Sequence, residues 1–300
     1  MSTPNQGRTA VIAGATGFIA TAVATQLRAE GWNVIRLVRR APLGANEVQW
    51  NPATGELDPS VLSGVDAVIN MAGASIGKMP WTAAWKREIM DSRVQTTGTL
   101  ARAMASAEVP PTVFLSASGT GSYGNRGDEG LDESSERSAG YLADVVVAWE
   151  AAAQPAIDAG VRTVFLRTGI VLGDGGALSP LRLATQLGAA ARVGRGSQWW
   201  PWISMTDEVR AIVHLIDSKI AGPVNLVGPT PATSETITRA LARSMKRPHL
   251  FVIPEFVVRA CFGEGGIELL LWSQKVSPSA LLADGFEFTH TTAAAALDSL

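Results

Sequence analysis

The chain has 300 residues, of which 46% are hydrophobic and 17% are charged, a balance typical of a soluble protein with a large core. A formal net charge of −2 gives no overall attraction to nucleic acid or to an anionic membrane surface. The single cysteine, Cys261, excludes an internal disulfide, and no apolar stretch reaches the length of a membrane span. We therefore expect a cytoplasmic protein with neither a nucleic-acid nor a membrane partner.

Short β-branched runs alternate with helical patterns over the first two-thirds of the chain, which is typical of βαβ units and a parallel sheet. The expected strands cover residues 9–13, 33–38, 66–70, 112–118 and 162–172. The expected helices cover residues 18–31, closed by Gly31, then 81–107 and 141–160. The sequence thus predicts an α/β fold with a doubly wound parallel sheet.

The pattern changes after Gly173, where the glycine-rich "GDGGALSP" and the tryptophan-rich "GRGSQWWPWISM" follow. A helix opened by Thr206 and Asp207, with Asp207 as its cap, and a strand at 223–227 come next. We expect this part to be a smaller lobe grafted onto the first domain, because crossover strands return to one sheet. The predicted division is an N-terminal domain over 1–172 and a C-terminal substrate lobe over 173–300, with 223–227 returning to the sheet.

The segment "AGATGFIA" lies between the first expected strand and the first expected helix, where a dinucleotide-binding motif belongs. Gly14 permits the tight turn, Gly17 lets backbone amides approach a pyrophosphate, and Ala20 lets the helix lie close to the strand. The helix N-terminus then directs free N–H groups at the phosphates. The motif predicts a Rossmann-type domain that binds a dinucleotide; a glycine turn without a ligand is the alternative.

The end of the second expected strand indicates which dinucleotide is bound. An NAD site places a carboxylate there to accept from the ribose hydroxyls, whereas a 2′-phosphate favours guanidinium groups and repels an acid. The chain reads "LVRRAP", with Arg39 and Arg40 at this place and no acid. NADP(H) is therefore the expected cofactor. Two solvated surface arginines are the alternative, and a flavin or NAD protein is a further one.

Several motifs together resemble the extended branch of the short-chain dehydrogenase/reductase superfamily. They are "GATGFI", "INMAG" at 69–73, "LSASGTGSYG" at 115–124 and "LRTGIVLG" at 166–173. More narrowly, "MPWTAAWKREIMDSRVQTT", "AWEAAA", "GDGGAL", "QWWPWI" and the tail from "RPHLFVIPEFVVR" resemble an atypical, epimerase-like subfamily whose members are called nucleoside-diphosphate-sugar epimerases. The resemblance extends over nearly the whole chain.

The resemblance implies a set of cofactor contacts that are made largely by the backbone. In chain order, the implied cofactor-binding residues are Gly14, Thr16, Gly17, Phe18, Ile19, Arg39, Arg40, Asn70, Ala72, Gly73, Arg167 and Gly169. The first five match the phosphate loop and the arginine pair matches the adenosine-phosphate contacts. The next three match the turn beneath the cofactor ribose, and the last two match the segment that passes near the nicotinamide.

The resemblance also implies a catalytic tyrosine, a lysine four residues later that lowers its pKa, and a serine that binds the reacting oxygen. Tyr141 matches the tyrosine, but the lysine position holds Val145. The serine position falls on Gly119, between Ser118 and Thr120, of which Ser118 is the preferred candidate. Since a nearby cation lowers a pKa by about 1–3 units, we expect a weaker acid/base pair of Tyr141 and Ser118, with Lys86 as the cation to test.

The segment "QWWPWISMTD" weakens a nucleotide-sugar assignment, because Trp200 stands where similar proteins place an arginine on the diphosphate. Trp199, Trp200 and Trp202 form either an aromatic wall for a substrate or a packing cluster. Two functions follow: an NADP(H)-dependent, epimerase-like oxidoreductase with an unknown carbonyl or hydroxyl substrate, or an NADP(H)-binding sensor or partner-binding protein with little or no catalysis. We expect no metal site, because the three histidines are far apart, and by analogy a homodimer.

Overall fold

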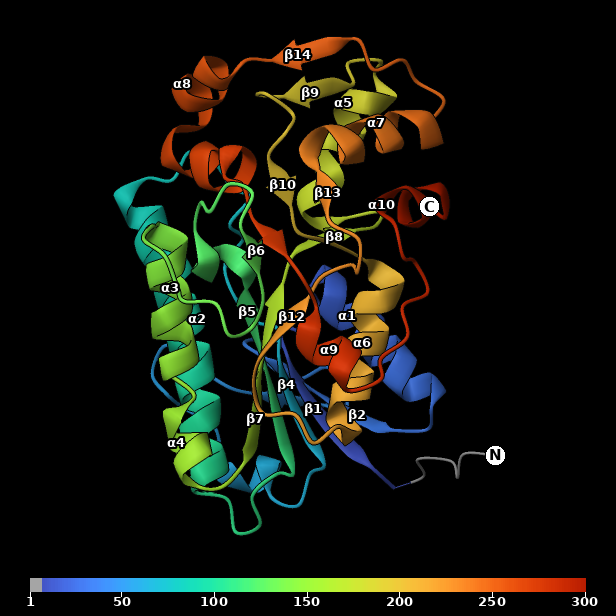
Figure 1. Ribbon diagram of the computed structural model, residues 1–300. Helices are drawn as coiled ribbons and strands as arrows, with labels where there is room; N and C mark the ends of the chain where they lie inside the picture. Colours follow the sequence, from blue (N-terminus) through green and yellow to red (C-terminus); the bar gives the residue numbers. More distant parts are fainter. Residues whose placement is uncertain (1–6) are drawn as a thin grey trace.

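A computed structural model describes residues 7–300, and its centre is a seven-stranded sheet in which every neighbouring pair is parallel (Figure 1). Across the sheet the strands follow the order β12-β7-β5-β4-β1-β2-β3. Their bounds are β1 Thr9–Ala13, β2 Asn33–Val38, β3 Glu47–Gln49, β4 Ala67–Asn70, β5 Val113–Gly119, β7 Arg162–Thr168 and β12 Gly222–Leu226. The predicted doubly wound α/β sheet is thus confirmed.

Helices cover both faces of the sheet (Figure 1). On one face lie α1 Phe18–Ala29 and α6 Met205–Asp217, and on the other lie α2 Ala83–Ala105, α3 Tyr141–Ala151 and α4 Gln154–Asp158. Alternate residues of β1 pack against the helices on opposite faces of the sheet. Ile12 lies in one apolar cluster with Val23 of α1, and Val11 lies in another with Leu100 of α2. All four of these side chains are fully buried, as expected for a strand inside a doubly covered parallel sheet.

The first helix ends as its sequence predicts. Glu30 closes α1, and Gly31 follows with a positive φ of +86°. The N–H of Trp32 donates to the carbonyl oxygen of Leu27 at 3.0 Å, the bond that ends a helix when a glycine turns left-handed. The chain is thereby directed into β2.

Two elements expected to be continuous are interrupted. The expected helix 141–160 is two helices, α3 and α4, and Pro155 stands in the first turn of α4, where its missing N–H costs no hydrogen bond. The expected strand 162–172 divides at Gly169 into β7 and β8 Ile170–Leu172. A Cβ at Gly169 would lie 2.5 Å from the carbonyl oxygen of Pro201, so this residue permits a close backbone approach.

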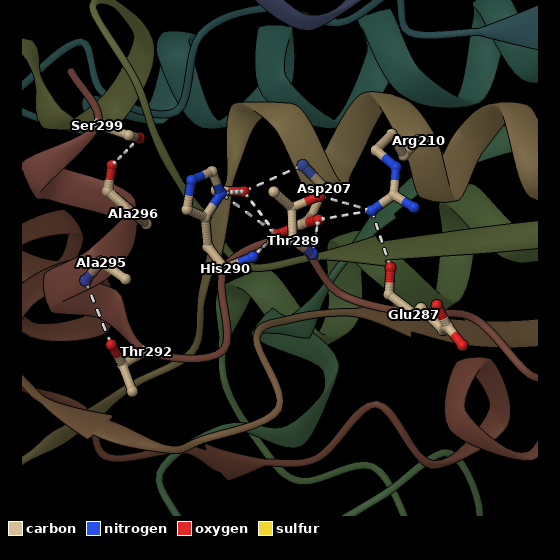
Figure 2. A network of polar contacts seen from close by, with 10 residues as sticks. Asp207, Arg210, Glu287, Thr289, His290, Thr292, Ala295, Ala296 and Ser299 are labelled. Carbon is tan, nitrogen blue, oxygen red and sulfur yellow. Dashed lines mark hydrogen bonds and ion pairs between the residues drawn. The ribbon is translucent and has the colours of Figure 1, made fainter.

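The prediction that Asp207 caps α6 is wrong. Ser204 is the N-cap, and its hydroxyl accepts from the N–H of Asp207 at 3.0 Å. The buried carboxylate of Asp207 instead accepts from the backbone N–H groups of Thr289 and His290 at 2.7 and 2.9 Å (Figure 2). Burial alone raises the pKa of Asp207, but these donors reverse the effect and hold the pKa below its usual value. Asp207 therefore fastens the C-terminal tail to α6.

The rest of the C-terminal half forms a layer of short elements beyond the carboxyl edge of the sheet (Figure 1). Its strands and their partners are β6 Gly130–Leu131 with β15 Lys275–Val276, β8 with β11 Trp202–Ser204, β9 Ala191–Val193 with β14 Phe251–Ile253, and β10 Trp199–Trp200 with β13 Ala232–Thr233. Its helices are α5 Ser179–Gln186, α7 Ser234–Ser244, α8 Glu255–Gly266 and α10 Ala293–Asp298. The remaining helix, α9 Ser279–Ala283, lies beside β12 at the level of the sheet (Figure 1). Short helical turns cover Pro59–Leu62, Thr120–Tyr123, Gly176–Leu178 and Ile267–Leu271.

The C-terminal half is not separate from the sheet, because β12 pairs in parallel with β7 and supplies one edge strand, as the pattern at 223–227 predicts. The division into domains at residue 172 stays a prediction, and residues 1–6 of the first domain lie outside the described residues. Over residues 7–300, no helix has both the length and the apolar character needed to cross a membrane.

Candidate functional site

The phosphate loop joins β1 to α1 at the carboxyl edge of the sheet. Gly14 has a φ of +77°, and a Cβ there would lie 2.7 Å from backbone atoms of Met71 and Ala72. The loop therefore touches the turn that follows β4, and only a glycine permits this approach. The first N–H groups of a helix have no intrahelical acceptor, and Gly17, the N-cap of α1, offers them no side-chain acceptor. This is an arrangement that binds phosphate.

Phe18 connects the phosphate loop to the C-terminal half. Thr16, Gly17 and Phe18 are exposed, and the phenyl ring lies 2.8 Å from where a Cβ of Gly173 or Gly175 would stand. The glycine run that follows β8 thus fits around the ring. The sequence motif predicts for Phe18 a contact made largely by its backbone, and the run "GDGG" is the signal that could have indicated this side-chain contact.

The two predicted phosphate-binding arginines differ in their surroundings, although both are exposed directly after β2. Arg40 donates twice to the carboxylate of Glu47, at 2.8 and 2.9 Å, and Arg36 forms an ion pair with the same group at 2.8 Å. Arg39 forms no ion pair within residues 7–300. Its guanidinium is therefore open to a phosphate, while that of Arg40 is already held.

Glu47 is the acid that the sequence analysis missed, because it belongs to the next strand, β3, and not to the end of β2. Its side chain is 3% exposed. Hydrogen bonds from Arg40, and then from the N–H of Leu43, lower its pKa to about 2. Two guanidinium groups, those of Arg36 and Arg40, meet this one carboxylate, and Arg39 adds a third positive charge nearby. The neighbourhood therefore stays positive and favours an anion.

The turn after β4 is shaped by buried polar groups. Asn70 is fully buried. Its side-chain N–H donates to the hydroxyl of Thr97 at 2.9 Å, and its side-chain amide oxygen accepts from the backbone N–H of Ala72 at 3.1 Å. The indole of Trp149 donates to the same hydroxyl at 2.9 Å. Asn70 thus supports the turn from below. At Gly73 a Cβ would lie 3.3 Å from the guanidinium carbon of Arg93, so the turn also contacts α2.

Tyr141 begins α3, and its hydroxyl donates to the backbone carbonyl of Lys86 in α2. The ring meets that of Trp81 edge-on at 5.3 Å, and the Lys86 ammonium stands 4.3 Å from the ring centroid while it pairs with Glu264 at 2.7 Å. Burial raises the pKa of Tyr141 to about 12, against the opposing charge of Arg93. Lys86 therefore lies over the face of the ring, and the phenol is less acidic than a free one.

Val145 and Trp149 continue the stripe that Tyr141 begins, and this stripe packs on α2. Val145 is 2% exposed and shares an apolar cluster with Trp81 and Ile89. Trp149 is 7% exposed and bonds to Thr97 of α2. A lysine at position 145 would thus enter an apolar contact between two helices, which explains why valine suits this position.

Ser118 lies in a different polar network from Tyr141. Its hydroxyl donates to Glu150 at 2.7 Å, and Glu150 forms two bonds of 3.0 Å with Arg167. Arg167 also donates to the hydroxyl of the fully buried Tyr123 at 3.2 Å. Burial favours the neutral form of Arg167, but the bonds and charge of Glu150 prevail and raise its pKa. The hydroxyls of Ser118 and Tyr141 therefore have separate partners.

The tryptophan cluster contributes mainly to packing. Trp200 and Trp202 are 3% and 1% exposed, and their indoles donate to the carbonyl oxygens of Leu270 and Thr230. Trp199 is half-buried and donates to Asp128 at 2.7 Å. Of the two alternatives drawn from the sequence, the packing cluster describes Trp200 and Trp202.

A polar cleft of about 350 Å³ lies beside the start of α3. Its walls include Asn125 and Asp128 from one side, with Arg195, Arg259 and Trp272 from the C-terminal half. The Trp272 ring occupies the place that a Cβ at position 140 would need, next to Tyr141. The cleft therefore has both charges and an aromatic wall, which are common features of a small-molecule site.

No metal centre was found within residues 7–300, where no three side chains of His, Cys, Asp or Glu gather in a suitable group. His214 of α6 bonds instead to Asp284 at 2.8 Å.

Comparison with known proteins gives a family match over most of the chain. The NAD dependent epimerase/dehydratase family matches residues 10–248, and a domain of unknown function, DUF1731, matches residues 253–300. An epimerase family protein of Mycobacterium bovis, Mb2239, is 43% identical over 288 residues, which is 95% of each chain.

Two solved structures are similar throughout this chain. The human epimerase family protein SDR39U1, crystallised with NADPH, has a TM-score of 0.89 at 32% identity and covers 97% of this chain and 98% of its own. A nucleoside-diphosphate sugar epimerase from Corynebacterium glutamicum has a TM-score of 0.79 at 32% identity, and the match covers 97% of this chain and 57% of that one. The chain therefore belongs to the NAD dependent epimerase/dehydratase family, as an atypical, epimerase-like short-chain dehydrogenase/reductase.

Proposed function

We propose that the chain binds NADP(H) at the carboxyl edge of its sheet. The observation that carries the proposal is the pair formed by the phosphate loop, where Gly14 allows no side chain, and the unpaired guanidinium of Arg39 at the end of β2. An uncapped helix N-terminus suits the pyrophosphate, and a positive neighbourhood suits the 2′-phosphate. The similar human protein was crystallised with NADPH, which adds support.

The residues present fit this cofactor in separate roles. The N–H groups after Gly17 would bind the pyrophosphate, and Arg39 would bind the 2′-phosphate with Arg40 held beside it by Glu47. The turn at Ala72 and Gly73 would lie beneath the ribose. A bound NADP(H) supplies hydride transfer at its nicotinamide.

We propose further that the protein acts as an epimerase-like oxidoreductase on a carbonyl or hydroxyl substrate held in the polar cleft beside α3. The proximity of Trp272 in the cleft wall to the start of α3 supports this placement. The proton-transfer role of Tyr141 and the oxygen-binding role of Ser118 stay predictions, as do a homodimer and a cytoplasmic location. For Tyr141 to act, its hydroxyl must first leave the carbonyl of Lys86.

A second function, NADP(H) binding with little or no catalysis, is favoured by the surroundings of Tyr141. Its pKa is raised to about 12, whereas proton transfer at neutral pH is most efficient when the pKa is near 7. Its hydroxyl is occupied by a backbone carbonyl, and the lysine position is buried valine. A sensor or partner-binding protein would need the cofactor site alone.

Binding measurements with NADPH and NADH test the proposal. Charged hydrogen bonds contribute about 1.5–3 kcal/mol, so Arg39→Ala should weaken NADPH binding about 10- to 100-fold and leave NADH binding unchanged. Arg40→Ala should have a smaller effect, because Glu47 already holds that guanidinium. Arg28→Ala, at the far end of α1, is the matched control. Equal affinity of wild type and Arg39→Ala for NADPH would contradict the assignment.

Measurements of NADPH oxidation distinguish the oxidoreductase from the NADP(H)-binding protein without catalysis. NADPH oxidation should be followed across a broad panel of carbonyl compounds with the wild type and with Tyr141→Phe and Ser118→Ala. Oxidation that both substitutions reduce would support the oxidoreductase. Tight NADPH binding without oxidation of any compound would favour the sensor.

A further inference from the structure

Arg93 is a buried cation without a carboxylate partner. It lies in the middle of α2, is 9% exposed and forms no ion pair within residues 7–300. Its Nη1 atom donates to the carbonyl oxygens of Ala74 and Ile89, both at 3.0 Å. Burial lowers its pKa to about 10, so it remains charged at neutral pH. Burying a charge is costly unless it is paired, which raises the question of what Arg93 binds.

The position of Arg93 connects it to the phosphate loop. Its guanidinium carbon lies 3.3 Å from the place of a Cβ at Gly73, while backbone atoms of Met71 and Ala72 lie 2.7 Å from the place of a Cβ at Gly14. The loop, the turn after β4 and the guanidinium thus form a continuous series of contacts at the carboxyl edge of the sheet.

The guanidinium retains unused hydrogen-bonding capacity. An arginine has five N–H donors, and the two bonds from Nη1 leave those on Nε and Nη2 without an acceptor among the described residues. The guanidinium carbon lies 4.8 Å from the centroid of the Trp149 ring, over the ring, in a cation–π contact. A fixed, planar fork of this kind suits the oxygen atoms of sugars and phosphates.

Arg93 also faces the stripe of α3 that lacks a lysine. Tyr141, Val145 and Trp149 form that stripe, and Arg93 contacts Trp149 and lowers the pKa of Tyr141 against the effect of burial. A cation therefore reaches this region from α2, although position 145 of α3 supplies none. The spacing of Ile89, Arg93 and Thr97 shows that α2 presents this charge on its buried face.

We propose that Arg93 binds oxygen atoms of the nicotinamide-side half of the dinucleotide, and so replaces the lysine that is missing four residues after Tyr141. Arg93 acts as a cofactor-positioning residue, which explains why an unpaired charge is kept beneath the turn. The inference rests on the proposed NADP(H) binding and adds to it a residue from α2.

Comparing NADPH with adenosine 2′,5′-bisphosphate tests whether Arg93 acts on the nicotinamide half alone or on cofactor binding as a whole. Adenosine 2′,5′-bisphosphate carries the adenosine and 2′-phosphate of NADPH and lacks the nicotinamide half. Arg93→Met, which keeps the length of the side chain, should weaken NADPH binding at least 10-fold and leave adenosine 2′,5′-bisphosphate binding within 2-fold. Arg39→Ala should weaken both ligands, and Arg87→Met, an exposed arginine of the same helix, should weaken neither. Titration calorimetry measures each affinity.

Two results would overturn the inference: a folded Arg93→Met protein that binds NADPH as tightly as wild type, or one that loses both ligands equally. If Arg93→Met does not fold, Arg93→Lys decides, because it keeps the charge and loses the planar fork. It should bind NADPH several-fold more weakly with the bisphosphate unchanged, and wild-type affinity for both would overturn the inference. A wild-type protein that binds neither ligand would instead refute the proposed function itself.

Discussion

The cofactor edge and the region around Tyr141 are built from different parts of the chain. At the cofactor edge, backbone N–H groups and glycines within one strand–turn–helix unit define the phosphate loop. Around Tyr141, side chains of α2, α3 and the C-terminal half determine each contact. A backbone site depends on local conformation, whereas a side-chain site depends on which helices meet. The first therefore follows from a short motif, and the second requires the whole fold.

Gly14→Ala tests the cofactor edge and should have the largest effect. A positive φ costs an alanine about 1–2 kcal/mol and overpacking about 1–3 kcal/mol. With its Cβ 2.7 Å from the turn after β4, the variant should lose about 2–5 kcal/mol of unfolding free energy and bind NADPH at least 100-fold more weakly. Urea unfolding and calorimetry measure the two quantities.

Gly31→Ala is the matched control, because Gly31 also has a positive φ but no atom lies within 4 Å of its Cβ position. It should lose stability and keep NADPH affinity. Wild-type affinity in Gly14→Ala would show that the close approach is not needed for binding.

Glu208→Gln, in α6 beside the last residue of β7, should have the next largest effect. Glu208 is fully buried, accepts from Thr168 at 2.9 Å, and burial raises its pKa to about 8. An unfolded glutamate has a pKa of about 4.3. The stability that comes from the neutral, buried carboxyl is therefore fully present below that pH and is lost as the pH rises through about 8. The wild-type Tm should fall by several degrees between pH 6 and 8.5.

Glu208→Gln should remove that loss and melt higher than wild type at pH 8.5, which thermal unfolding across this range measures. Glu56→Gln, at an exposed position, should retain the wild-type slope. Parallel pH profiles for wild type and Glu208→Gln would show that Glu208 is ionised in the folded protein.

Tyr141→Phe should have the smallest effect. It tests directly whether the region around Tyr141 is separate from the cofactor edge. The substitution removes one hydrogen bond to the carbonyl of Lys86, which contributes about 0.5–1.5 kcal/mol, and keeps the ring contact with Trp81. NADPH affinity should stay within 2-fold of wild type. A tenfold loss of affinity would show that the phenol takes part in the cofactor site.

The sequence predicts the regular elements well, where periodicity and local signals agree. The bounds of β1 and β2 match, and Gly31 ends the first helix, because short β-branched runs and a left-handed glycine act locally. The motif after β1 likewise lies at a strand–helix junction. These features need no knowledge of distant residues.

Contacts between distant residues escaped prediction. Glu47 reaches Arg40 from the next strand, and Asp207 bonds to the tail instead of capping its own helix. Arg93 reads in the sequence as one more charge of a long helix, and only the packing of α3 shows that it is buried. One local signal was overlooked: Arg93 occupies the same helical face as Ile89.

The bonds between Asp207 and the tail make one end of α6 depend on residues far along the chain. Asp207 becomes buried when α6 closes on the sheet, yet the N–H groups that satisfy it belong to Thr289 and His290, near the end of the 300-residue chain. Without these donors the buried carboxylate at the start of α6 would lack its backbone partners, which costs about 1–3 kcal/mol or more for a charged group. A change in the segment around residue 289 should therefore destabilise a helix that lies about 80 residues earlier in the sequence.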